Sequence, residues 1–261
     1  MILSYAYCNA SLMPMRAEPS HKAEMVNQIL YGEKVEVLEI NEEEWAKVRC
    51  ELDEYIGWCK VSQITIVTAK EYKKQAKHIA LSNNNHFVFE NSTQWVPMGS
   101  ELFAVRGGKV NIQGKEGKYK GKRLSYEKMN PVPEQIIEAA KEYINAPYLW
   151  GGRSIAGIDC SGLVQMAFKM CGEAVPRDAS QQAEIGEDVD FLQHARAADL
   201  AFFDNAEGRI THVGILIDDS HILHATDTSG RVVIDKIDQG GIISKILKRR
   251  THKLRMIKRY L

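Results

Sequence analysis

The stretch Ile158-Asp159-Cys160-Ser161-Gly162-Leu163-Val164 places a cysteine between an aspartate and an apolar run. This order predicts a loop that becomes a helix, with Asp159 as the N-cap and Cys160 as the first helical residue. Unpaired backbone N–H groups and the positive end of the helix dipole favour a thiolate at that position. The alternative is that Cys160 is a small buried residue, as most free cysteines are. The rest of the chain decides between the two.

The helix that begins at Cys160 has a predicted apolar face and a glycine, Gly172, after its end. That face consists of Leu163, Val164, Ala167, Phe168 and Cys171. A second amphipathic helix is expected over 133–144, with a proline at its start and Pro147 after its end. Its apolar face consists of Ile136, Ile137, Ala140 and Ile144. We expect the apolar stripe of the first helix to pack against a sheet.

Three runs further along the chain supply that sheet. Residues 210–217, 221–226 and 231–235 are predicted as strands of a meander, because short polar turns separate them. His212 lies near the start of the first strand and His224 near the middle of the second. A single histidine in a strand is more often a hydrogen-bonded core or surface residue than a catalyst. Adjacent antiparallel strands, however, bring these two opposite each other at about 5 Å.

Cys160, His212 and His224 together have the chemistry of a nucleophilic site. A thiol with an ordinary pKa near 8.5 needs a base or a cation to become a thiolate at neutral pH. The base in turn needs a third group that holds its tautomer. A cysteine at a helix start and two histidines on adjacent strands can fill these three roles.

The N-terminal half has a different character. Residues 1–127 consist of short alternating runs broken by glycine, asparagine and charged turns, a pattern that predicts small antiparallel barrels. We expect one barrel over 1–67 and a second over 68–128, the second supported only by alternation and length. The stretch Pro131-Val132-Pro133 then forms a stiff joint. The helices and the sheet described above make up a third domain over 129–261.

Five motifs in the C-terminal half occur in a diagnostic order. They are Tyr148-Leu149-Trp150-Gly151-Gly152, Asp159-Cys160-Ser161-Gly162-Leu163-Val164, Ala198-Asp199-Leu200-Ala201-Phe202-Phe203, His212-Val213-Gly214-Ile215 and Ile222-Leu223-His224-Ala225. This half resembles the NlpC family of bacterial cysteine peptidases, a circularly permuted branch of the papain-like superfamily. The spacing of Tyr31-Gly32, Trp45 and Gly57-Trp58 is similar to that of the bacterial SH3-like domain. The resemblance implies an α+β fold, with a papain-like NlpC catalytic domain preceded by two small all-β SH3-like barrels.

The resemblance also implies a role for each reacting group. Cys160 would be the nucleophile, His212 the general base and acid, and His224 the polar residue that orients His212. Tyr148 is expected to contact the oxyanion or the substrate, and the Cys160 backbone N–H to donate to the oxyanion. The implied reaction is acyl transfer through a thioester at a γ-D-glutamyl bond of a peptidoglycan stem peptide. No cofactor and no metal are expected.

Asp178 favours a free peptide as the substrate. An acidic side chain that faces the cleft pairs with a free α-ammonium group, and this contact is lost when muramic acid acylates the amine. The stretch 16–28 is also similar to a subgroup that recycles murein peptides and releases L-Ala-D-Glu from them. By that resemblance, Glu24 and Tyr55 are expected to contact the terminal alanine.

The same resemblance places three more residues in the substrate site, namely Asp159, Ser161 and Ser180. The chain departs from the subgroup at Ala179, where a small hydroxyl residue is expected. One hydrogen bond to the substrate is therefore either missing or supplied by Ser180.

Composition limits the partners. Lys plus Arg and Asp plus Glu both number 34 in 261 residues, so the net charge is zero and nucleic acid is not expected as a partner. No run approaches the roughly 18 apolar residues of a membrane span. Five scattered cysteines without a C-x-x-C pair argue against a disulfide scaffold and a zinc ribbon. We expect a soluble, cytoplasmic monomer, or a periplasmic or secreted one if a signal peptide has been removed. Its partner would be the murein stem peptide L-Ala-γ-D-Glu-Lys or L-Ala-γ-D-Glu-diaminopimelate.

Three alternatives stay open from the sequence. The protein could be a secreted endopeptidase that acts on intact peptidoglycan. It could be a wall-binding module whose papain-like domain no longer catalyses a reaction. It could also be a metal-dependent hydrolase with Cys160, His212 and His224 as zinc ligands.

Overall fold

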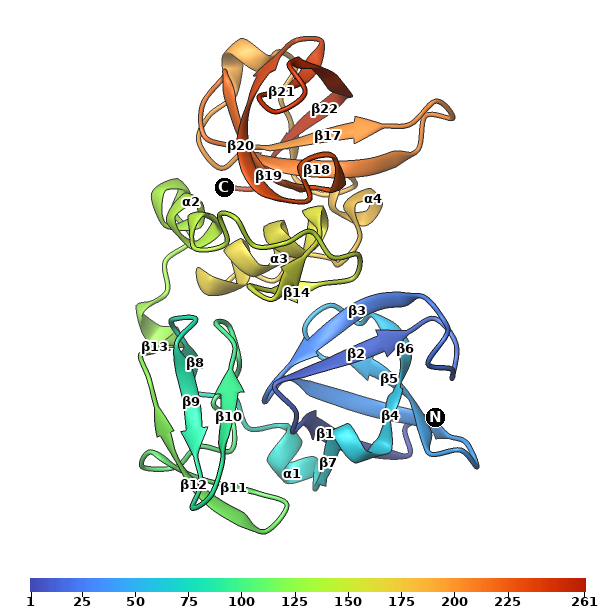
Figure 1. Cartoon of the computed structure of the whole chain (residues 1–261), viewed down its shortest axis with the longest axis vertical. Coiled ribbons are helices and arrows are strands. Elements are labelled where there is room, and N and C mark those ends of the chain that lie inside the picture. The colour runs from blue at the N-terminus through green and yellow to red at the C-terminus, as the bar shows by residue number, and fades with distance from the viewer. The chain divides into compact units, whose positions relative to one another are not determined.

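The computed structural model describes residues 1–261, which form two compact units, Met1–Met129 and Asn130–Leu261. Strands outnumber helices in both units, as Figure 1 shows. None of the helices combines the length and the apolar character that crossing a bilayer requires.

Seven strands of the first unit form one antiparallel sheet, in the order β3-β2-β6-β5-β4-β1-β7 (Figure 1). They are β1 (Ser4–Cys8), β2 (Leu12–Arg16), β3 (Met25–Leu30), β4 (Lys34–Ile40), β5 (Trp45–Cys50), β6 (Ile56–Lys60) and β7 (Ile64–Val67). Alternate residues point into the core, as in β4, where Val35 and Val37 are fully buried and Glu36 is only half-buried.

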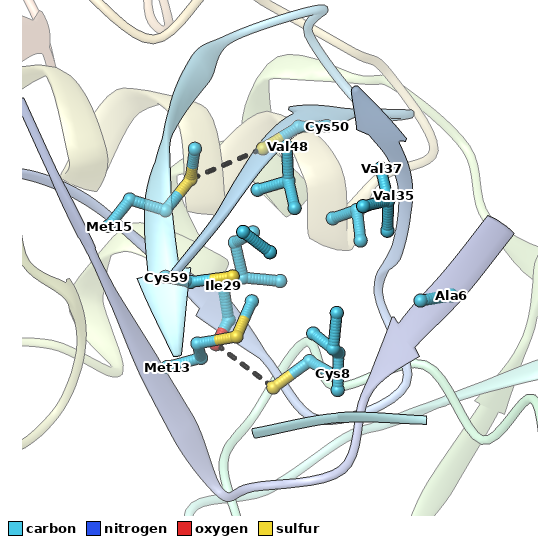
Figure 2. Close-up of a cluster of buried hydrophobic side chains, with 12 residues drawn as sticks. Ala6, Cys8, Met13, Met15, Ile29, Val35, Val37, Val48, Cys50 and Cys59 are labelled. Atoms are coloured by element: carbon cyan, nitrogen blue, oxygen red, sulfur yellow. Dashed lines mark hydrogen bonds between the residues drawn. The ribbon is translucent and has the colours of Figure 1, made fainter. Parts of the chain in front are cut away.

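The core of this sheet is rich in sulfur (Figure 2). The thiol of Cys50 lies 3.5 Å from Met15 Sδ, and Cys8 Sγ lies 3.6 Å from the carbonyl oxygen of Ile29. Burial raises the pKa of the Cys59 thiol to about 12 and the pKa of Cys8 well above its ordinary value. Cys8 and Cys59 are therefore protonated core residues.

Six further strands of the first unit form a four-stranded sheet, β10-β9-β12-β11, and a two-stranded sheet, β13-β8. They are β8 (His78–Ala80), β9 (Asn85–Val88), β10 (Thr93–Val96), β11 (Lys109–Ile112), β12 (Lys115–Lys120) and β13 (Arg123–Ser125), preceded by the short helix α1 (Ala69–Tyr72). A second SH3-like barrel in this region, and the division into three domains, stay predictions.

Gly32 lies where the β8–β13 region packs against the seven-stranded sheet. It has a φ of +80°, and a Cβ atom there would lie 1.8 Å from the carbonyl oxygen of Glu101. The neighbouring Tyr31 carbonyl accepts a hydrogen bond of 2.9 Å from Glu101 N–H. The Tyr31 ring meets the Phe87 ring edge-on at 4.7 Å between centroids. Only glycine permits this approach of the two backbones.

The second unit contains a seven-stranded sheet in the order β16-β22-β17-β18-β19-β20-β21, and β21 also pairs with β22. Its strands are β16 (Glu187–Asp188), β17 (Leu200–Asp204), β18 (Ile210–Leu216), β19 (His221–Thr226), β20 (Arg231–Asp238), β21 (Gly241–Ser244) and β22 (Arg249–Arg259); β14 (Arg153–Ser154) and β15 (Gly157–Ile158) form a separate pair. The three strands of the predicted meander are confirmed as β18, β19 and β20.

Three helices accompany this sheet, α2 (Pro133–Lys141), α3 (Cys160–Met170) and α4 (Ala179–Gln182), and α3 packs against both α2 and β18 (Figure 1). The prediction of a single apolar face on α3 is wrong, because every residue of this helix is buried. The predicted end of α2 is also too late. The chain leaves the helix after Lys141 and turns through Asn145, whose φ is +68°, so Ile144 is 37% exposed.

Candidate active site

Cys160 is the first residue of α3, and Asp159 is its N-cap, as predicted from the sequence. Asp159 Oδ1 accepts a hydrogen bond of 2.7 Å from Gly162 N–H, which satisfies one unpaired donor of the first turn. A Cβ atom on Gly162 would lie 2.4 Å from the carbonyl oxygen of Gly152. The absence of a side chain at Gly162 therefore lets the preceding loop pack directly on the start of α3.

A buried ion pair holds this loop. Arg177 Nη2 donates to Asp159 Oδ2 at 2.6 Å, and Arg177 Nη1 donates to Asp159 Oδ1 at 3.0 Å and to Ser161 Oγ at 2.8 Å. Asp159 Oδ2 also accepts from Gly151 N–H at 2.8 Å. The structure thus gives Asp159 and Ser161 partners within the protein, and their predicted contacts with substrate stay predictions.

The surroundings of Cys160 do not favour a thiolate. Burial raises the pKa of the Cys160 thiol to about 12, and the nearby Asp159 carboxylate raises it further. The backbone N–H of Val213, the guanidinium of Arg177 and the backbone N–H of Ser161 oppose this effect without overcoming it. The expectation of a thiolate at the helix start is therefore wrong, because desolvation outweighs the helix terminus.

His212 on β18 and His224 on β19 are hydrogen-bonded, with 2.9 Å between His212 Nε2 and His224 Nδ1. Their ring centroids are 5.1 Å apart. The two residues are diagonal neighbours rather than directly opposite, because the register that pairs Ile215 with Leu223 places Gly214 across from His224. A Cβ atom on Gly214 would lie 2.6 Å from Ile222 Cδ1 and 3.0 Å from His224 Cβ, so glycine provides space for both side chains.

Tyr148 is half-buried in the segment that leads to the nucleophile. Its N–H donates to the carbonyl oxygen of Gly230 at 2.8 Å, and it forms a parallel bridge with Ile158. Burial raises the pKa of the Tyr148 hydroxyl, and the charge of Cys160 adds to this effect. The phenol is therefore protonated at neutral pH and can donate a hydrogen bond.

The predicted residues Asp178 and Ser180 lie at the start of α4. Asp178 is its half-buried N-cap, with its N–H 3.3 Å from Gln181 Oε1, and Ser180 is exposed on the helix. Gln182 Nε2 donates to the carbonyl oxygen of Ser161 at 3.1 Å, which ties α4 to the first turn of α3. The structure thus places both residues on an element anchored beside the nucleophile.

Glu24 and Tyr55 belong to the first unit. Glu24 is exposed and directly precedes β3, and Tyr55 is half-buried in the turn before β6. Because Arg16 at the end of β2 pairs with Trp58 in an antiparallel arrangement, the loop with Glu24 and the turn with Tyr55 lie at the same end of this sheet. Their contacts with substrate stay predictions.

The sequence of this chain is similar to those of known proteins. A model described as the NlpC/P60 family matches residues 145–251, and one described as the bacterial dipeptidyl-peptidase SH3 domain matches residues 15–64. A gamma-D-glutamyl-L-lysine dipeptidyl-peptidase from Bacillus subtilis is 30% identical over 79% of this chain and 74% of its own length. The chain belongs to the NlpC/P60 family. Dipeptidyl-peptidase 6 from Lysinibacillus sphaericus is 26% identical over 88% of this chain and 90% of its own length.

This NlpC/P60 chain also shares its fold with a solved structure. The crystal structure of an NlpC/P60 family protein from Bacillus cereus matches 99% of this chain and 100% of its own, with a TM-score of 0.82 and 20% identity. The family predicted from the five motifs is confirmed, as are one SH3 domain and the enzyme class, a cysteine peptidase.

Two residues near the histidines of this NlpC/P60 peptidase escaped the sequence analysis. Asp235 on β20 places its Oδ2 at 3.3 Å from His224 Nε2, and His252 on β22 stacks on His212 at 4.2 Å between ring centroids. Asp235 could have been found from the sequence, because it is an acidic residue on the predicted strand that follows the strand of His224. His252 comes from β22, the last strand of the chain, which lies beyond β17 and also pairs with β21, and no local pattern predicts its position.

These neighbours keep the His212 ring neutral. Burial lowers the pKa of His212 well below its ordinary value, and the nearby His224 and His252 rings lower it further. Burial also lowers the pKa of His252 to about 4. An acceptor nitrogen is therefore present on His212 at neutral pH, which a general base requires.

No group of three or more His, Cys, Asp or Glu side chains has an arrangement that could hold a metal ion. The polar groups instead contact one another, His212 through His224 and His224 through Asp235.

Proposed function

We propose that this peptidase hydrolyses the γ-D-glutamyl–diamino acid bond of free murein stem peptides with an N-terminal L-Ala and releases L-Ala-D-Glu. The observation that carries the proposal is the contact of the buried Cys160 sulfur with the N–H of Val213, the residue after His212, which is itself hydrogen-bonded to His224. The names of the relatives support the substrate class, since two of them, from Bacillus subtilis and Bacillus cereus, are gamma-D-glutamyl-L-lysine dipeptidyl-peptidases.

The resting site holds a neutral thiol and a neutral imidazole. The pKa of Cys160 is raised by burial and the pKa of His212 is lowered by burial, so an ion pair between them is not the ground state. The sulfur contacts the N–H of Val213, the residue after His212. Catalytic hydrogen bonds are often formed only when substrate binds.

The chemistry then follows general-base catalysis. As the sulfur of Cys160 attacks the γ-carbonyl carbon, its proton passes to His212. The tetrahedral intermediate collapses to a thioester when the C–N bond breaks, and His212 protonates the departing amine of the diamino acid. His212 next takes a proton from water as the hydroxide attacks the thioester carbonyl. The C–S bond then breaks, the sulfur of Cys160 takes the proton back from His212, and the product with its free γ-carboxyl group is released.

The developing oxyanion has donors available at the start of α3. The Cys160 N–H is one of the first-turn donors that a helix leaves without an intrahelical partner. The Tyr148 hydroxyl, protonated at neutral pH, is a second donor within electrostatic reach of the sulfur. Both fit the role of stabilising negative charge on the carbonyl oxygen.

Selectivity for free peptides would come from acidic side chains that bind the α-ammonium group. Asp178 at the start of α4 and Glu24 before β3 are the candidates, with Tyr55 packing on the terminal alanine and Ser180 donating to the peptide. An acylated amine carries no charge and would lose the charge-assisted contacts.

The test compares L-Ala-γ-D-Glu-diaminopimelate with the same peptide N-acetylated, with release of the diamino acid followed by mass spectrometry at neutral pH with reductant. The proposal predicts a strong preference for the free amine. Equal cleavage of both peptides would favour an endopeptidase that acts on intact peptidoglycan. Cys160→Ala is the control and should abolish turnover of either peptide, whereas a non-catalytic wall-binding module would show no turnover in the parent protein. The cytoplasmic location, the monomeric state and the choice between lysine and diaminopimelate stay predictions.

A further inference from the structure

Asp235 is a buried carboxylate in line with the two histidines. Its Oδ2 lies 3.3 Å from His224 Nε2, and its Oδ1 accepts a hydrogen bond of 2.9 Å from Lys245 N–H. Burial tends to raise the pKa of Asp235, but the hydrogen bonds from His224 and Lys245 outweigh it, so the pKa is lowered and the group is ionised at neutral pH. Both carboxylate oxygens can therefore only accept hydrogen bonds.

Asp235, His224 and His212 lie on three neighbouring strands, and each is diagonally across from the next. Asp235 is paired with Ile222, and His224 is paired with Val233, so Asp235 lies diagonally across from His224 on the same face. His212 is diagonal to His224 on the other side. The carboxylate and the two rings thus follow one another across β20, β19 and β18, and each is held by its strand.

The acceptor role of Asp235 determines which ring nitrogen of His224 and His212 donates and which accepts. Since Asp235 only accepts, a proton of His224 resides on Nε2, and in the neutral form of this ring Nδ1 is an acceptor. The contact of 2.9 Å between the rings then requires that His212 donates from Nε2. A neutral His212 with its proton on Nε2 has its free electron pair on Nδ1. This is the tautomer in which Nδ1 can accept the proton of the nucleophile.

We infer that Asp235 is a positioning residue of the peptidase, which sets the tautomer of His224 and, through it, the tautomer of His212. The inference rests on the proposed roles of Cys160 and the two histidines. Asp235 does not touch the substrate and acts only through His224. The line therefore extends the Cys160, His212 and His224 set by a fourth member on the next strand.

Asp235→Asn tests this with almost no change in shape. Lys245 N–H donates to the Oδ1 position and would select the amide oxygen there, so the amide NH₂ would face His224 Nε2. Nε2 would then have to accept, Nδ1 of His224 would donate to His212 Nε2, and the His212 proton would move to Nδ1. The base would be in the wrong tautomer, as in the serine protease case where this change lowers kcat by about 10⁴.

We expect Asp235→Asn to lower kcat by roughly 100-fold or more with little change in KM, because the substrate contacts are untouched. The matched control is Asp238→Asn on the same strand, whose half-exposed carboxylate accepts from Arg250 and from the Gly240 N–H at the surface, and this variant should retain the parent kcat. A kcat for Asp235→Asn within twofold of the parent would overturn the inference. Loss of activity in Cys160→Ala alongside a normal Asp235→Asn would reject the positioning role and leave the proposed function intact.

A readout that needs neither activity nor a variant is the ¹⁵N chemical shift of the histidine side chains. In the parent protein at neutral pH, the inference requires a protonated Nε2 and an unprotonated Nδ1 on both His212 and His224. Asp235→Asn should exchange these assignments on both rings. An unprotonated Nε2 on His224 in the parent protein would overturn the inference, even if the variant failed to fold.

Discussion

Arg177 and Asp159 form a bidentate ion pair that is almost completely buried, directly before the nucleophile. The side chains are 1% and 7% exposed, and the shortest contact is 2.6 Å. The same carboxylate caps α3 through Gly162 N–H and holds the preceding loop through Gly151 N–H. The pair therefore fixes where the helix starts, and with it the position of the Cys160 sulfur.

Arg177→Met should destabilise the protein by about 3 to 5 kcal/mol, because it leaves the Asp159 carboxylate buried and without its countercharge. Urea denaturation measures the free energy of unfolding. The control is Arg250→Met, which breaks a half-exposed pair with Asp238 and should cost about 0 to 1 kcal/mol. Equal losses in the two variants would show that the buried pair contributes no more than the surface pair.

The stability of the second unit should fall as the pH decreases below about 6.5. The pKa values of His212 and His252 are lowered in the folded protein, the latter to about 4, so the unfolded chain binds more protons in this range. More protons bound by the unfolded state means that acid favours unfolding. Urea denaturation at pH 7.5, 6.5 and 5.5 measures the slope.

His252→Gln should reduce that slope, since it removes one of the two neutral rings. The matched control is His194→Gln, which replaces an exposed histidine of the same unit and should keep the parent slope. A slope unchanged by His252→Gln would mean that the His252 ring does not resist protonation in the fold.

Alkylation of Cys160 by iodoacetamide should accelerate by about tenfold per pH unit from pH 7 to pH 10, because the reactive thiolate is a minor species below a pKa of about 12. Mass spectrometry of the peptide that contains Cys160 separates it from the other four cysteines. Free glutathione is the control, and its rate should level off above its ordinary thiol pKa. A constant rate for Cys160 between pH 5 and pH 8 would instead reveal a preformed thiolate.

Local signals predicted much of this architecture. The Asp159 cap and the Cys160 helix start depend on adjacent residues, and the strands with His212 and His224 are bounded by polar turns. Such features are encoded within a few residues of chain, so the sequence contains them.

Features that depend on packing between elements were not predictable. The pKa of Cys160 is set by the burial of all of α3, which periodicity alone had suggested was buried on one face. Asp235 meets His224 through a diagonal offset across strands, and His252 meets His212 from the last strand of the sheet. Register and closure of a sheet follow from its tertiary contacts, and one residue of slip would move each of these side chains to the other face.

Gly32→Ala should destabilise the first unit far more than Gly108→Ala, although both glycines have a φ close to +80°. The positive φ costs an alanine about 1 to 2 kcal/mol at either site. A Cβ atom at Gly108 meets nothing within 4 Å, whereas at Gly32 it would lie 1.8 Å from the Glu101 carbonyl oxygen, so the two backbones must separate. We expect a loss of roughly 4 kcal/mol or more for Gly32→Ala by urea denaturation. Similar losses for both variants would show that the β8–β13 region can move away from the seven-stranded sheet at little cost, and that the Tyr31–Glu101 contact does not hold the first unit together.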